Sequence, residues 1–161
     1  MIIRSLAAAL FLAWLTPASA LPPLPPGNAL EVADALSEAI PAAEKAWPGY
    51  RVLETPLLVV LKDGAALLLG RPSPPPGFKA FRRGGSIFAF SEKGPALDFP
   101  FRLNWEFAGG TLTAVRQDAE GPLSEPAWLA RFAVHERFHG FQSSRNFAPP
   151  GEPYAVEDER D

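Results

Sequence analysis

Both histidines of this 161-residue chain lie in one five-residue motif, His135-Glu136-Arg137-Phe138-His139, and their spacing constrains the local fold. On an α-helix, residues i and i+4 project from the same side, so a helix brings the two imidazoles together. Glu136 then lies about 100° round the helix from His135, beside the imidazole pair. The spacing predicts a helix that carries every histidine of the chain on one face.

This HExxH pattern is typical of a metal site with an adjacent general base. Imidazole nitrogens are good ligands for Zn²⁺, and a carboxylate next to them can move a proton without being a ligand. We therefore predict that His135 and His139 bind Zn²⁺ and that Glu136 is catalytic. The alternative is an accidental motif in an ordinary helix.

The first twenty residues have the pattern of a secretory signal peptide. Arg4 supplies the positive end, an apolar run extends from Leu6 to Leu15, and Ala18-Ser19-Ala20 forms a small-residue cleavage site. We expect cleavage after Ala20, a secreted or periplasmic protein, and no stable membrane insertion after cleavage. An uncleaved membrane anchor is the alternative. With no cysteine, the exported chain would fold without disulfides.

Composition favours one globular domain after this signal. The chain is 47% hydrophobic, and its net charge of −3 gives no basic footprint for nucleic acid. Residues 21–27 are proline-rich and predict an extended linker. Residues 28–161 would then form a single domain, and we expect it to be the front part of a longer protein. The sequence carries no signal for the oligomeric state.

Local patterns predict an α+β fold with an N-terminal helix, a mixed or antiparallel sheet of about four to six strands, and a buried motif helix. Asn28 would cap a helix from 29 to about 46, kinked at Pro41. Asp63-Gly64 between apolar runs and Gly109-Gly110 between alternating segments predict two hairpins. Residues 86–91 predict a further strand, and residues 71–85, with Lys79, Arg82 and Arg83, a solvated loop.

The motif helix is expected over residues 125 to about 144. Ser124 would cap it, with Pro126 in the first turn. Its apolar residues lie on nearly every side, which predicts a buried helix. At 100° per residue the metal face carries Trp128, Phe132, His135, His139 and Gln142, and the opposite face, which would pack on the sheet, carries Ala130, Val134, Phe138 and Phe141.

The residues His135-Glu136-Arg137-Phe138-His139 resemble the active-site helix of the zincin metallopeptidases. Zincins place this helix behind a mixed sheet whose edge strand holds a peptide substrate in extended form. The resemblance implies that His135 and His139 bind zinc, that Glu136 deprotonates the zinc-bound water, and that the substrate is a peptide or protein.

The resemblance leaves the third zinc ligand open. No further histidine exists, so the zincins with a third histidine are excluded. Zincins of the gluzincin type use a glutamate about nineteen residues past the second histidine. Nineteen residues separate Glu159 from His139, with Glu157 as the alternative and Asp158 between them, and Glu152 is a poorer candidate. A solvated acidic tail, with the ligand beyond Asp161, is the other reading.

Other polar residues near the motif have weaker claims. Tyr50 and Tyr154 are candidate transition-state donors, whereas Arg131 and Arg137 are expected to be exposed or salt-bridged. The leading hypothesis is an exported zinc peptidase. The alternatives are a non-catalytic zinc-binding domain and a cell-envelope interaction module.

Overall fold

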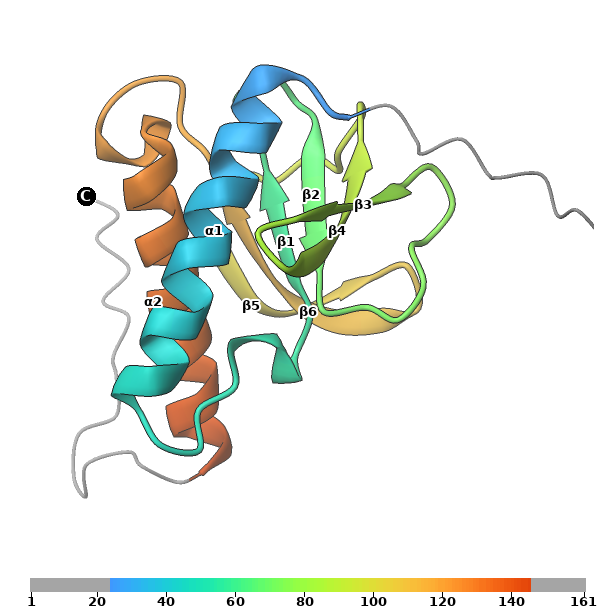
Figure 1. Cartoon of the computed structure of the whole chain (residues 1–161). Coiled ribbons are helices and arrows are strands. Elements are labelled where there is room, and N and C mark those ends of the chain that lie inside the picture. Colours follow the sequence, from blue (N-terminus) through green and yellow to red (C-terminus); the bar gives the residue numbers. More distant parts are fainter. Residues whose placement is uncertain (1–23, 146–161) are drawn as a thin grey trace, which may run out of the picture.

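The computed structural model describes residues 24–145 as two helices and one six-stranded mixed sheet, which confirms the predicted α+β class (Figure 1). The helices are α1 (Gly27–Ala46) and α2 (Pro126–Ser144). The strands are β1 (Leu57–Val60), β2 (Ala66–Leu69), β3 (Lys79–Arg83), β4 (Ser86–Ser91), β5 (Phe101–Phe107) and β6 (Gly110–Arg116), in the spatial order β3-β4-β2-β1-β6-β5. Neither described helix is long and apolar enough to cross a membrane.

The centre of the sheet is the predicted hairpin of β1 and β2. Leu57 pairs with Leu69 and Val60 with Ala66, and Gly64 provides the turn with φ of +84°. Both strands are buried at every position, as their continuous apolar runs predicted. β1 also pairs in parallel with β6, and such a pairing between distant segments leaves no local sequence signal.

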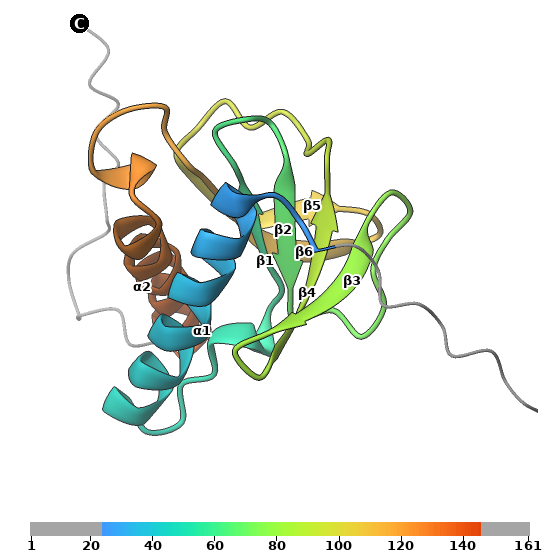
Figure 2. The same cartoon turned by 45° about the horizontal axis from the view of Figure 1, so that its top comes forward.

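Both helices cover the same face of the sheet (Figure 2). Alternate residues of the central hairpin, including Leu57, Val59 and Leu67, join the core formed with α1 and α2. Leu58 and Leu68 point to the other face, where Leu97 and the partly buried rings of Phe78, Trp105 and Phe107 cover them. Strands with two covered faces explain the apolar runs.

The prediction of a loop over residues 71–85 is wrong for the second half of this segment. Residues 79–83 form the edge strand β3, which pairs with β4 through a turn at Gly84 and Gly85. Only Phe81 of this strand is buried, where it stacks on Phe88. One inward side chain in five residues is too weak a pattern to distinguish a strand from a loop.

The three cations of this segment therefore lie on a strand. Arg83 forms an ion pair with Asp34 of α1, and its carbonyl accepts a hydrogen bond from the Ser37 hydroxyl at 3.1 Å. Lys79 and Arg82 are exposed on the sheet edge. Charged side chains on an edge strand discourage pairing with another chain.

The β5–β6 hairpin is confirmed, with its turn one residue earlier than predicted. Ala108 and Gly109 occupy the turn with positive φ, and β6 begins at Gly110. A bulge between Arg102 and Trp105 inserts one residue into β5. The bulge changes the face to which the strand presents its side chains. Phe101 consequently contacts Phe132 of α2, whereas Trp105 packs on the opposite face.

The two predicted side-chain caps are absent because both side chains form other hydrogen bonds. Asn28 exchanges two hydrogen bonds with the buried amide of Gln117, at 2.9 and 3.2 Å. The Ser124 hydroxyl donates to the Gly121 carbonyl within a 3₁₀ turn, Pro122–Ser124. α1 begins at Gly27 and continues through Pro41, and α2 begins at Pro126.

Candidate metal centre

The two motif histidines converge on the exposed face of α2. Nε2 of His135 lies 2.9 Å from Nε2 of His139, and the ring centroids are 4.5 Å apart with the planes nearly perpendicular. His135 is exposed and His139 is half-buried. The predicted i, i+4 geometry is therefore present, with the two Nε2 atoms within hydrogen-bond distance of each other.

Glu136 completes the group. The three side chains have ligand atoms within 4.8 Å of one another, and this is the metal-compatible group of three found among residues 24–145. Glu136 is only 5% exposed. Burial raises the pKa of its carboxyl group above the usual range, while the neighbouring imidazoles, when charged, oppose that rise. A carboxylate in this environment is a stronger proton acceptor than one in water.

The separation of the imidazoles suits a single metal ion. Zinc–nitrogen bonds of about 2.0–2.1 Å with tetrahedral angles place two ligand nitrogens about 3.3 Å apart. The observed 2.9 Å is close to that value, and a small rotation of either exposed or half-buried ring would reach it. Nitrogen donors of this kind also bind copper, iron and nickel. The group can hold a metal ion, and its geometry alone does not select which one.

α2, predicted to be a buried helix, is buried on one side only. Leu129, Ala130, Ala133, Val134 and Phe141 are buried, but Trp128 is 56% exposed. The metal face is bordered by aromatic rings, since Phe132 lies between Trp128 and His135 on it and contacts Phe101 of β5, with centroids 5.8 Å apart. The solvent-facing side of the helix is thus the side that carries the histidines.

Arg137 anchors the opposite side of α2, which corrects the expectation that it is exposed or salt-bridged. It is 5% exposed, and it forms no ion pair with any of residues 24–145. Its Nε donates to the Val52 carbonyl at 3.1 Å, and its Nη1 donates to Thr113 Oγ1 of β6 at 3.3 Å. Two residues from each histidine, it points about 160° away from both of them.

Tyr50 also contacts the back of the motif helix. Its hydroxyl donates to the Val134 carbonyl at 2.9 Å, and its ring lies against Phe138 and Phe141. The side chain is 1% exposed, and this burial raises its pKa to about 12. Tyr50 is therefore a structural contact of the motif helix, and its hydroxyl is engaged away from the imidazoles.

The remaining predicted site residues lie outside the described part of the chain. Glu159, Glu157, Asp158 and Glu152, the candidate third ligands, and Tyr154, the candidate donor, all follow residue 145. Sequence reasoning missed one residue of the site that is described. The helical periodicity places Gln142 on the metal face and indicates no role for it, but its Oε1 lies 3.2 Å from Nδ1 of His139.

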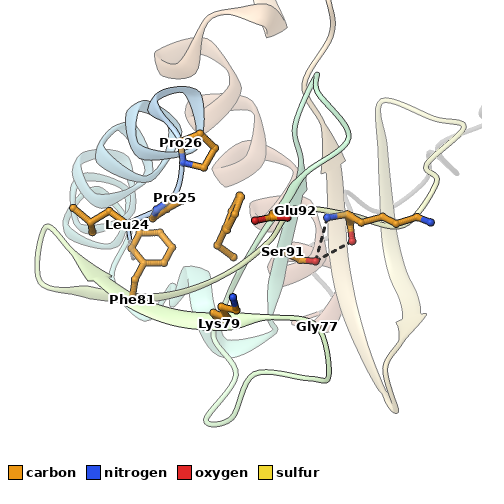
Figure 3. A pocket seen from close by; sticks show the side chains of 10 residues that line it. Leu24, Pro25, Pro26, Gly77, Lys79, Phe81, Ser91 and Glu92 are labelled. Atoms are coloured by element: carbon orange, nitrogen blue, oxygen red, sulfur yellow. Dashed lines mark hydrogen bonds between the residues drawn. The ribbon is translucent and has the colours of Figure 1, made fainter. Parts of the chain in front are cut away.

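A separate cavity of about 430 Å³ lies at the other edge of the sheet (Figure 3). It is bounded by residues 24–26, which lead into α1, and by the β3–β4 hairpin with the rings of Phe81 and Phe90. Pro25 is buried there, so the end of the predicted linker packs on the domain. No residue of the HExxH motif lines this cavity.

Comparison with protein families, with curated proteins and with solved structures finds no match for this chain.

Proposed function

We propose that this protein is an exported, zinc-dependent peptidase of the zincin type. The observation that carries the proposal is the convergence of the His135 and His139 Nε2 atoms at 2.9 Å, with the Glu136 carboxylate beside them. An HExxH sequence in a strand or a kinked segment would not give this geometry. The signal-like residues 1–20 support export.

His135 and His139 would hold the ion, and Glu159, or Glu157 in its place, would complete the site. A Zn²⁺ ion held there would supply a lowered pKa for bound water and polarisation of the carbonyl of the scissile bond. Glu136 would accept a proton from the attacking water and then return it to the leaving amine. Its burial and raised pKa support this role, because the ideal base has a pKa near the working pH.

The edge strand β5 is the most suitable place for an extended peptide. Of the two edge strands, β5 contacts α2 through the ring pair of Phe101 and Phe132, whereas β3 lies at the far edge of the sheet. A peptide added along β5 would pair its main chain with the free strand edge. Its alternate side chains would then face Phe132 and Trp128 beside His135.

The first experiment is to measure zinc content and peptide cleavage of the full-length chain. We expect about one zinc per chain, lost in His139→Ala, and cleavage of an unstructured protein substrate that falls by about 10²–10⁴-fold in Glu136→Gln. Glu136→Gln should keep its zinc, because the glutamate is not a ligand. Arg131→Gln, an exposed change on the same helix, is the control.

Two results would contradict the proposal in different ways. If the wild type and Glu136→Gln bind zinc equally and neither cleaves the substrate, the protein would be a metal-binding domain without catalysis. No zinc in the folded protein would mean that this chain does not assemble the site.

A further inference from the structure

We infer that Gln142 is a positioning residue for the metal centre, and that it fixes the tautomer of His139 so that Nε2 is available to the ion. Gln142 lies three residues after His139 on α2, so the two side chains leave the same face of the helix. Its amide oxygen, Oε1, is 3.2 Å from Nδ1 of His139. The inference rests on the proposed function and names a further residue of the same site.

The chemistry of the two groups determines where the imidazole proton lies. A neutral imidazole carries one proton, on either Nδ1 or Nε2, and only the unprotonated nitrogen can bind a metal. In this orientation of the Gln142 amide its oxygen, which can only accept a hydrogen bond, faces the ring, and Nδ1 of His139 is then the donor. Nε2 of His139 then keeps its lone pair, and it is this atom that faces Nε2 of His135 at 2.9 Å.

The position of Gln142 is supported by the end of the helix. The Arg145 N–H donates to the Gln142 carbonyl at 3.2 Å, which closes the last turn of α2. The next residue towards the motif, Phe141, is 5% exposed and anchors this turn in the core. Gln142 itself is half-buried, so its side chain is neither fully exposed to solvent nor enclosed in the core.

Residues that hydrogen-bond to the outer nitrogen of a metal-bound histidine commonly contribute 10–100-fold to metal affinity. We therefore expect Gln142→Met, which keeps the length of the side chain but has no oxygen, to weaken Zn²⁺ binding by about 10–100-fold. Gln142→Glu places a carboxylate oxygen at the same position. It should restore the affinity to the wild-type value or above it.

The test combines zinc titration with NMR of the imidazole nitrogens. Because the chain has two histidines, a ¹⁵N-histidine sample gives only two rings to assign, and His135→Gln identifies them. In the metal-free wild type at slightly alkaline pH, we expect the proton of His139 on Nδ1. In Gln142→Met it should redistribute towards Nε2. Ser143→Ala, an exposed change at the next residue, should alter neither the tautomer nor the affinity.

Unfolding temperatures of the metal-free proteins separate positioning from stability. Gln142→Met should unfold within a few degrees of the wild type while its zinc affinity falls. If Gln142→Met does not fold, the tautomer of His139 in the wild type and in Gln142→Glu tests the inference. A wild-type His139 protonated on Nε2, or equal zinc affinity in Gln142→Met and the wild type, would overturn the inference. A wild type that binds no zinc would refute the proposed function, whereas the tautomer would still test Gln142.

Discussion

Arg137 and Gly140 form a pair on the buried side of the motif helix. Arg137 donates to the Val52 carbonyl and to Thr113, and these two acceptors fix its guanidinium. A Cβ atom added at Gly140 would lie 2.8 Å from the Arg137 Nη1 atom. A glycine inside a helix normally costs about 1 kcal/mol relative to alanine. Here the missing side chain makes room for the buried cation.

Whether Gly140→Ala raises or lowers the free energy of unfolding should therefore depend on Arg137. In the wild type we expect Gly140→Ala to lower the free energy of unfolding by about 1–2 kcal/mol, because the guanidinium must leave its buried acceptors. In an Arg137→Ala background the same change should raise the free energy of unfolding by about 1 kcal/mol, through helix propensity alone. Urea unfolding of the four proteins measures both values and their coupling. The same effect in both backgrounds would show that the two residues are independent.

The buried Tyr50 predicts a loss of stability at alkaline pH. Its pKa is about 12 in the folded protein and 10.0 without burial. Between these values the folded state keeps a proton that the unfolded state has lost. The stabilising contribution is thus fully present below pH 10 and lost as the pH rises to about 12, which amounts to roughly 3 kcal/mol.

Unfolding measured against pH in the wild type and in Tyr50→Phe tests this assignment. The other alkaline groups titrate in both proteins, so the difference between the curves isolates Tyr50. We expect the wild type to lose more stability than Tyr50→Phe between pH 10 and 12. Parallel curves would mean that the Tyr50 hydroxyl ionises as readily in the folded protein as in water.

At the scale of elements, the turn of the β5–β6 hairpin contains a strained residue. Ala108 has φ of 49°, a left-handed conformation that costs a residue with a Cβ atom about 1 kcal/mol or more. Arg71 holds this turn through hydrogen bonds to the carbonyls of Phe107 and Ala108, at 2.7 and 2.8 Å. The tertiary contact stabilises a backbone conformation that alanine alone disfavours.

Ala108→Gly should consequently stabilise the protein by up to about 1 kcal/mol. The hydrogen bonds from Arg71 are to backbone carbonyls and do not depend on the Ala108 side chain. Ala119→Gly is the matched control, since Ala119 is exposed and has no positive φ. It should lower stability slightly by adding freedom to the unfolded chain. Thermal unfolding of both variants gives the comparison. A lower unfolding temperature for Ala108→Gly than for the wild type would contradict the claim that Ala108 is strained.

At the scale of the whole molecule, the arrangement places the metal face of α2 towards solvent while the rest of the domain is anchored around it. α1 and the sheet bury Leu129, Ala133 and Val134 of α2, and β5 borders its exposed face. A ligand that binds only the folded chain stabilises the whole domain, because unfolding separates the residues that hold it.

Zinc should therefore raise the unfolding temperature of the full-length chain. At a free concentration of 100 times Kd the stabilisation is about 2.7 kcal/mol, which corresponds to a shift of several degrees for a domain of this size. A chelator should reverse the shift, and His139→Ala should abolish it. An equal shift in His139→Ala would place the bound ion elsewhere on the chain. Calorimetry with and without zinc measures the effect.

Local signals in the sequence predicted the helical HExxH motif and both hairpins. The spacing of the histidines acts within one turn of helix, and Asp63-Gly64 acts within one turn of a hairpin, so neither depends on distant residues. The side-chain caps at Asn28 and Ser124 were local predictions too. They were wrong because Gln117, far from Asn28 in sequence, and the 3₁₀ turn at Ser124 supply competing hydrogen bonds.

Tertiary structure alone decided the features that join segments far apart in the chain. The parallel pairing of β1 with β6 and the strand β3 arise from contacts with other strands. The burial of Arg137 depends on acceptors 24 and 85 residues away. A sequence pattern indicates which face of a helix or strand is apolar. The segment that covers this face is determined by the packing of the whole chain. The sequence thus determined the imidazole pair, and the fold determined which distant residues hold its helix in place.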